Sequence, residues 1–139
     1  MTDTRTGQMD AERLREILEI SPFHRWLGLR IVSQSRDSLE LEMPWRDEIV
    51  SNPAIGAAHG GILSALVDLT GLYAILAAGG VAKATADLRV DFHRAATEGS
   101  LRAIGRPIKM GRTLSIADTQ ILGADGRLLA SGRGAYVSG

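Results

Sequence analysis

The chain has 139 residues, of which 45% are hydrophobic, so it suits one globular domain with a sizeable core. Sixteen acidic and sixteen basic side chains give a formal net charge of zero. The chain therefore has no net positive charge that would attract nucleic acid or an anionic membrane surface. The absence of cysteine excludes disulfides, thiolate metal ligands and a cysteine nucleophile.

The N-terminal part of the chain predicts a tail, two helical segments and two strands. Residues 1–8 are polar and lack the apolar stretch of a secretory signal, so we expect a flexible tail, a single domain over residues 9–139, and a cytoplasmic location. Asp10 can cap a helix that ends before Pro22, and residues 23–28 read as a short helix or turn. A strand is expected near residues 29–33. The next strand is indicated by the alternating apolar positions Leu39, Leu41, Met43 and Trp45.

The longest apolar run covers residues 62–82 and predicts a buried helix, because polar residues and glycines interrupt it too often for a membrane span. His59-Gly60-Gly61 stands at its start, and Asp68 lies within it. Glycine lets a backbone N–H approach a ligand, and the free N–H groups of a helix start favour an oxygen that becomes negative during reaction. A lone carboxylate in an apolar helix is costly unless something uses it. This combination predicts acyl chemistry.

Three or four strands are expected after the helix. In residues 84–92, apolar side chains alternate with polar ones such as Thr85 and Asp87. Further strands are expected around residues 101–108, 112–122 and 127–137, and Ala124-Asp125-Gly126 is typical of the last hairpin turn. The order predicts an α+β fold in which a single antiparallel sheet of five to six strands wraps around the long central helix. Open sheet edges predict a homodimer that continues the sheet.

These residues resemble a known family. Asn52 to Gly61, followed by Asp68 nine positions after His59, is similar to the hotdog-fold acyl-CoA thioesterases of the phenylacetate-degradation (PaaI-like) type. The segment from Thr85 to Ala95 resembles the family's strand after the central helix, and the likeness extends from about Pro22 to Val137. The resemblance implies the hotdog fold, hydrolysis of an acyl-CoA thioester, and a homodimer that pairs again into a homotetramer.

The resemblance also implies roles for individual residues. Asp68 would be the nucleophile or the general base for water, and the Gly60 N–H would bind the oxyanion, with Gly61 beside it. His59 would position this turn, and Thr85 would help to hold the attacking water. Relatives contact coenzyme A at the positions of His93, Arg94, Lys109, Gly111 and Arg112. No resident cofactor is implied, since coenzyme A is part of the substrate, and three scattered histidines make a metal site an unfavoured interpretation.

The chain departs from the family pattern before the histidine. The amide that polarises the thioester carbonyl usually stands six positions before it, where this chain has Pro53, and Asn52 lies one position earlier. Asn52 could take this role through a bulge in the loop, or Asn52-Pro53 could be only a turn. Asp68 could likewise be a structural acid hydrogen-bonded to Ser64, one helical turn earlier.

Helix geometry adds an expectation of its own. Asp68 follows Gly60 by eight residues, which is about 12 Å along a helix. One thioester carbon needs the oxyanion donor and the attacking oxygen within roughly 3 Å of it. We therefore expect a composite site, in which Gly60 of one subunit faces Asp68 of its two-fold neighbour.

Two other functions stay open at this point: a hydratase or dehydratase acting on enoyl thioesters, and a module that binds acyl-CoA without turnover. Small residues along the helix (Ala65, Gly71 and Ala74) favour room for an aryl or medium-chain acyl group.

Overall fold

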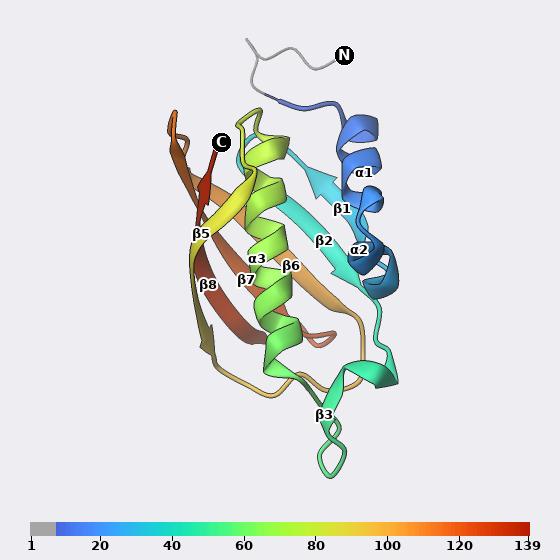
Figure 1. The fold of residues 1–139 in the computed structure, drawn as a ribbon. Coiled ribbons are helices and arrows are strands. Elements are labelled where there is room, and N and C mark those ends of the chain that lie inside the picture. The colour runs from blue at the N-terminus through green and yellow to red at the C-terminus, as the bar shows by residue number, and fades with distance from the viewer. Residues whose placement is uncertain (1–7) are drawn as a thin grey trace.

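In the computed structural model, which describes residues 8–139, one long helix lies across a curved antiparallel sheet (Figure 1). The predicted tail lies outside these residues except for Gln8. The helices are α1 (Ala11–Ile20), α2 (Pro22–Leu27) and α3 (Gly60–Ala77), with a 3-10 turn η1 (Asp47–Ile49). The strands are β1 (Arg30–Gln34), β2 (Leu39–Met43), β3 (Val50–Asn52), β4 (Ala57–Ala58), β5 (Ala84–Phe92), β6 (Leu101–Lys109), β7 (Leu114–Leu122) and β8 (Leu128–Val137).

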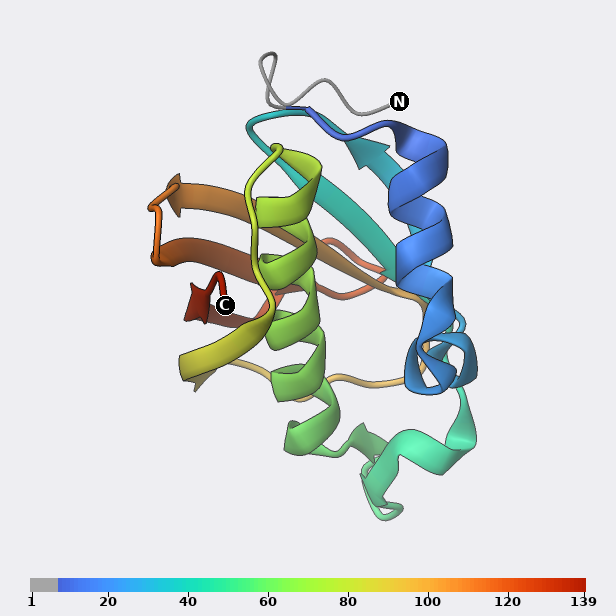
Figure 2. The same ribbon diagram turned by 45° about the horizontal axis from the view of Figure 1, so that its top comes forward.

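The main sheet has six strands in the order β1-β2-β6-β7-β8-β5, and every neighbouring pair is antiparallel. The strands β3 and β4 form a separate two-stranded hairpin before α3. Figure 2 shows α3 crossing the concave face of the sheet, with α1 and α2 beside it. The predicted architecture of one sheet around one helix is confirmed, and β5 and β1 are the edges of that sheet.

The N-terminal helices form as their sequence predicts. The Asp10 carboxylate accepts a hydrogen bond from the Glu12 N–H and so caps α1, whose Leu14 and Leu18 are buried. Pro22 opens α2 directly after the capping Ser21. The helix ends at Gly28, which adopts a left-handed conformation with φ of 72°.

The central helix α3 is shorter than the apolar run that predicts it. It ends at Ala77, and the chain turns away through Gly79, whose φ is 93°. By length and composition α3 could span a membrane, but it is the core helix here, packed chiefly on β6, β7 and β8. Apolar side chains of β2 meet the same core, because Leu39, Leu41 and Met43 are buried on one face of that strand.

Candidate active site

The turn before α3 is held by hydrogen bonds on both sides. The His59 N–H donates to the Ile49 carbonyl at 2.7 Å, and the Ala58 N–H donates to the Ala96 carbonyl at 2.8 Å. His59 is also the N-cap of α3, where its Nδ1 accepts the Gly61 N–H at 2.7 Å. Gly61 must be small for this contact, because a Cβ on it would lie 2.9 Å from the same nitrogen. This capping contact is what a positioning role for His59 requires.

The Gly60 N–H is left free by this arrangement. Among residues 8–139 it has no hydrogen-bond partner, while the Gly61 N–H is taken by His59. A hollow of about 360 Å³ lies beside Gly60, lined by Leu63 and Phe92, by His93 and Arg94, and by small residues of the neighbouring loops. A free donor at a helix start beside a partly apolar hollow is suited to receive an oxyanion.

Asp68 lies in the middle of α3 and is only half-buried in the single chain, although the helix that carries it is predicted to be buried. Its Oδ1 accepts a hydrogen bond of 2.6 Å from the Thr85 hydroxyl of β5. The alternative bond from Ser64 does not form, because the Ser64 hydroxyl donates to the Gly60 carbonyl at 3.0 Å. The structure therefore brings the predicted residues Asp68 and Thr85 together.

A β-bulge explains why the Thr85 side chain lies on the face of β5 that carries α3. Thr85 pairs with Tyr136 and Asp87 pairs with Ala135, so Ala86 is an extra residue in β5. Simple alternation would place Thr85 on the face opposite Leu88, but the extra residue brings both to the face that carries α3. The predicted strand is confirmed, whereas its strict alternation is wrong at this end.

Tyr136 also contacts Asp68, and the sequence does not predict this contact. Its side chain is fully buried on β8, and its hydroxyl donates to the main-chain carbonyl of Asp68 at 2.9 Å. Burial, and then the negative charge of Asp68, raise the pKa of Tyr136 far above its usual range, so the phenol stays protonated. The signal that could have found it is a lone tyrosine in a strand otherwise rich in small residues, Gly132 and Gly134 among them.

Asn52 lies apart from these groups within the chain. It is exposed at the end of β3, and its side-chain oxygen accepts the Ala54 N–H at 3.1 Å, as in a turn-forming asparagine. In the described part of the chain it makes no hydrogen bond to Gly60 or Asp68.

The predicted coenzyme A residues fall into two groups at opposite ends of α3. His93 and Arg94 line the hollow beside Gly60, and the His93 Nε2 shares a hydrogen bond of 2.8 Å with the Ser131 hydroxyl. Lys109, Gly111 and Arg112 lie at the β6–β7 connection, whose Met110 reaches Gly80 just beyond the C-terminal end of α3. Figure 1 shows the two regions at the bottom and the top of the helix.

Two of the small helix residues do not provide room for an acyl group. A Cβ on Gly71 would overlap the Tyr136 hydroxyl, and the Ala74 Cβ lies 3.2 Å from the position that a Cβ on Gly105 would take. Both residues thus face the sheet, so their small size gives no space to an acyl group, and the preference for an aryl or medium-chain group stays a prediction.

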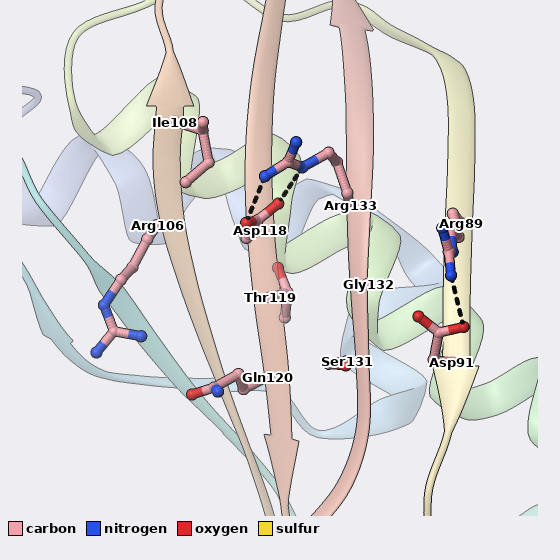
Figure 3. A pocket seen from close by; sticks show the side chains of 10 residues that line it. All are labelled: Arg89, Asp91, Arg106, Ile108, Asp118, Thr119, Gln120, Ser131, Gly132 and Arg133. Atoms are coloured by element: carbon pink, nitrogen blue, oxygen red, sulfur yellow. Dashed lines mark hydrogen bonds and ion pairs between the residues drawn. The ribbon is translucent and has the colours of Figure 1, made fainter.

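A separate hollow of about 550 Å³ lies on the outer face of the sheet, away from α3 (Figure 3). Arg89, Arg106 and Arg133 line it together with Asp91 and Asp118, and Arg133 holds Asp118 through two hydrogen bonds of 2.6 and 2.9 Å. None of the predicted site residues borders this hollow. Within residues 8–139, no three histidine or carboxylate side chains gather where they could hold a metal ion.

Comparison with known proteins agrees with this geometry. A family model described as the thioesterase superfamily matches residues 55–130, which include His59, Asp68 and Thr85. A solved protein of that superfamily is 42% identical, with 91% of this chain and 96% of that chain covered and a TM-score of 0.86. Zebrafish thioesterase superfamily member 2 is 25% identical, with coverage of 95% and 100% and a TM-score of 0.81.

The PaaI protein of the Escherichia coli phenylacetic acid degradation operon has the same fold. It is 22% identical, with 92% of each chain covered and a TM-score of 0.81. The family match spans more than half of the chain and includes the capped glycine turn and the helix carboxylate described above. This chain therefore belongs to the thioesterase superfamily and is a thioester hydrolase with the hotdog fold.

Proposed function

We propose that the protein hydrolyses acyl-CoA thioesters to a free acid and coenzyme A, with Asp68 as the acting carboxylate. The observation that carries this proposal is the hydrogen bond of 2.6 Å from Thr85 to one oxygen of Asp68. It holds the carboxylate in one orientation, while the half-exposed side chain keeps access to water or substrate.

The chemistry requires two functional groups. In the general-base route, Asp68 takes a proton from water as the water oxygen bonds to the thioester carbon. The Gly60 N–H, aided by the helix dipole, stabilises the resulting oxyanion. The carbon–sulfur bond then breaks, and the sulfur leaves as the thiol of coenzyme A after receiving the proton. In the nucleophilic route, Asp68 attacks the carbon itself, and the carbon–sulfur bond breaks to release the thiolate of coenzyme A. Water then cleaves the resulting anhydride, which frees the acid, regenerates the Asp68 carboxylate and supplies the proton that the thiolate takes up.

One chain does not bring these groups to one carbon, since Gly60 and Asp68 lie on the same continuous helix about 12 Å apart along its axis. Both, however, lie near β5: Gly60 is close to the Phe92 ring at one end, and Asp68 is bonded to Thr85 at the other. We propose that two chains pair antiparallel through this strand. In such a pair, the Phe92 end of β5 in one subunit lies beside the Thr85 end of β5 in the other. Gly60 of one subunit is thereby brought toward Asp68 of the partner subunit.

The surface of β5 supports this pairing. It is an edge of the sheet, so a second strand can bond to it, and its Phe92 side chain is 54% exposed. Leu88 and Val90 on the same strand are only partly covered. Pairing would bury these side chains. Association of two such dimers into a tetramer stays a prediction, which native mass spectrometry measures.

The same pairing would unite the two groups of coenzyme A residues. His93 and Arg94 stand near the N-terminal end of α3, and Lys109, Gly111 and Arg112 near its C-terminal end. Across a two-fold axis, opposite ends of the helices come together. We propose that the cationic side chains then bind the phosphates of coenzyme A from two subunits.

Release of free thiol from acyl-CoA esters tests the function directly. Short, medium, long and aryl esters are compared, because the acyl group stays a prediction. Asp68→Asn is expected to keep the fold and to lower kcat by about a hundredfold or more, the usual scale for a general base or nucleophile. A folded Asp68→Asn protein with near-normal turnover would remove Asp68 from the reaction. Loss of enoyl absorbance without thiol release would favour the lyase, and binding of coenzyme A without hydrolysis would favour the binding module.

A further inference from the structure

Tyr136 contacts Asp68 from the side that faces away from solvent. Its hydroxyl donates to the Asp68 main-chain carbonyl at 2.9 Å, and the side chain has no exposed surface. The phenol therefore meets neither substrate nor water in the chain, and any effect it has on the reaction passes through Asp68.

The fold makes room for this hydroxyl at two positions. A Cβ on Gly71 of α3, or on Gly134 of β8, would overlap the Tyr136 hydroxyl. Glycine within a helix or strand is otherwise unfavourable, because it loses more conformational freedom on folding than other residues do. The close fit of Tyr136 between two glycines places its hydroxyl under Asp68.

The hydrogen bonds from the sheet to α3 all converge on one residue. Among residues 8–139 there are two of them: Thr85 bonds to the Asp68 carboxylate, and Tyr136 bonds to the Asp68 carbonyl. Thr85 and Tyr136 are themselves cross-strand partners on β5 and β8. The rest of the contact between helix and sheet is mainly apolar, and apolar contacts are non-directional.

We propose that Tyr136 is a positioning residue for Asp68: its hydroxyl fixes the height and rotation of α3 so that the carboxylate meets Thr85 and the substrate. This inference rests on the proposed role of Asp68. Burial raises the pKa of Tyr136, so its phenol remains protonated, and thus a hydrogen-bond donor, under assay conditions.

The test compares Tyr136→Phe with Tyr73→Phe in the thiol-release assay. Tyr73 is the matched control, because it is also buried and donates its hydroxyl to a main-chain carbonyl, that of Ile17, without contacting Asp68. Tyr136→Phe is expected to lower kcat about tenfold to a hundredfold, the scale of a small misplacement of a reacting group, with KM within about twofold. Tyr73→Phe is expected to keep kcat. A purely structural role for Tyr136 would leave the kcat values of both variants near that of the wild type.

A double-mutant cycle with Thr85→Val adds a second readout. If both hydroxyls act through Asp68, their effects on kcat are coupled, and the double variant loses less than the product of the single losses. Full multiplicativity would overturn the inference. Gly71→Ala provides an independent perturbation should Tyr136→Phe not fold, since its methyl group displaces the hydroxyl and is expected to lower kcat in the same way.

The outcomes distinguish failure of the proposed function from failure of the positioning role alone. No thiol release by the wild type on any ester overturns the proposed function. An active wild type whose Tyr136→Phe variant matches Tyr73→Phe in kcat overturns only the positioning role.

Discussion

At the scale of single residues, two backbone N–H groups at the start of α3 have different roles: one takes part in capping the helix and the other is available to a ligand. His59 takes the Gly61 N–H, and the Gly60 N–H remains free among residues 8–139. Helix starts ordinarily leave such groups to water or to a ligand. The two glycines thus have different tasks: Gly61 makes space for the capping imidazole, and Gly60 presents a donor to the hollow.

This division predicts that proline at position 60 is more damaging than alanine. Gly60 is the first residue of α3, a position that tolerates proline, and His59 has the extended conformation that a residue before proline needs, with φ of −61° and ψ of 133°. Gly60→Pro is expected to fold but to lose about 10²–10³ in kcat, because it removes one oxyanion donor.

Gly60→Ala is the control for that substitution. It keeps the N–H, and its Cβ would make only an ordinary contact of 3.5 Å with the Phe92 ring. The measurement is thiol release together with circular dichroism. Equal kcat for the proline and alanine variants would show that the Gly60 N–H does not act in the reaction.

At the scale of elements, the bulge in β5 decides which hydroxyl meets Asp68. The extra residue Ala86 lets Thr85 share a face of β5 with Leu88. The edge strand thus supplies a hydrogen bond to Asp68 where β5 and α3 otherwise meet through apolar side chains. Bulges are common next to active sites, where the extra residue redirects a side chain.

Substitutions within this bulge test its role. Thr85→Val keeps the branched shape but removes the donor, so kcat is expected to fall about tenfold, near the lower end of the usual contribution of a positioning contact. Thr85→Ser keeps the hydroxyl and should stay within about threefold of wild type. Adding Ala86→Thr to Thr85→Val should not restore activity, because the exposed residue 86 has no place opposite Asp68. Rescue by that second substitution would show that the bulge is not maintained.

At the scale of the whole molecule, the proposed site belongs to two chains, and a mixing experiment tests this. Gly60→Pro and Asp68→Asn each inactivate every site in their own homodimers. A mixed dimer keeps one intact pair, with Gly60 from the Asp68→Asn chain and Asp68 from the Gly60→Pro chain. Random re-pairing of equal amounts is expected to restore about a quarter of wild-type activity, since half of the dimers are mixed and each has one working site.

The control is the same mixture without subunit exchange, which should remain inactive. If the reaction used Gly60 and Asp68 of one chain, every chain in the exchanged mixture would carry a defect, and no activity would return.

The sequence by itself determined the order of the main helices and strands, the wrapped sheet, the glycine turn before the central helix and the position of Asp68 within it, but not the short β3–β4 hairpin. Local pattern was sufficient here: alternation marks a strand such as β2, a polar cap marks α1, and a long apolar run marks a core helix. The resemblance to the thioesterase family depended on the same short-range spacing between His59 and Asp68.

Only the tertiary structure decided what Asp68 contacts. Ser64 is its neighbour along the helix, yet its hydrogen-bond donors come from Thr85 and from Tyr136, 68 residues further along the chain. Neither contact follows from periodicity. A bulge changes the face of β5 on which Thr85 lies, and the space for the Tyr136 hydroxyl depends on Gly71 of the distant helix α3 as well as on Gly134 of its own strand. The direction of a side chain at a site depends on the register between neighbouring strands and on the space that other elements leave for it. Both are determined only when the whole sheet packs against the helix.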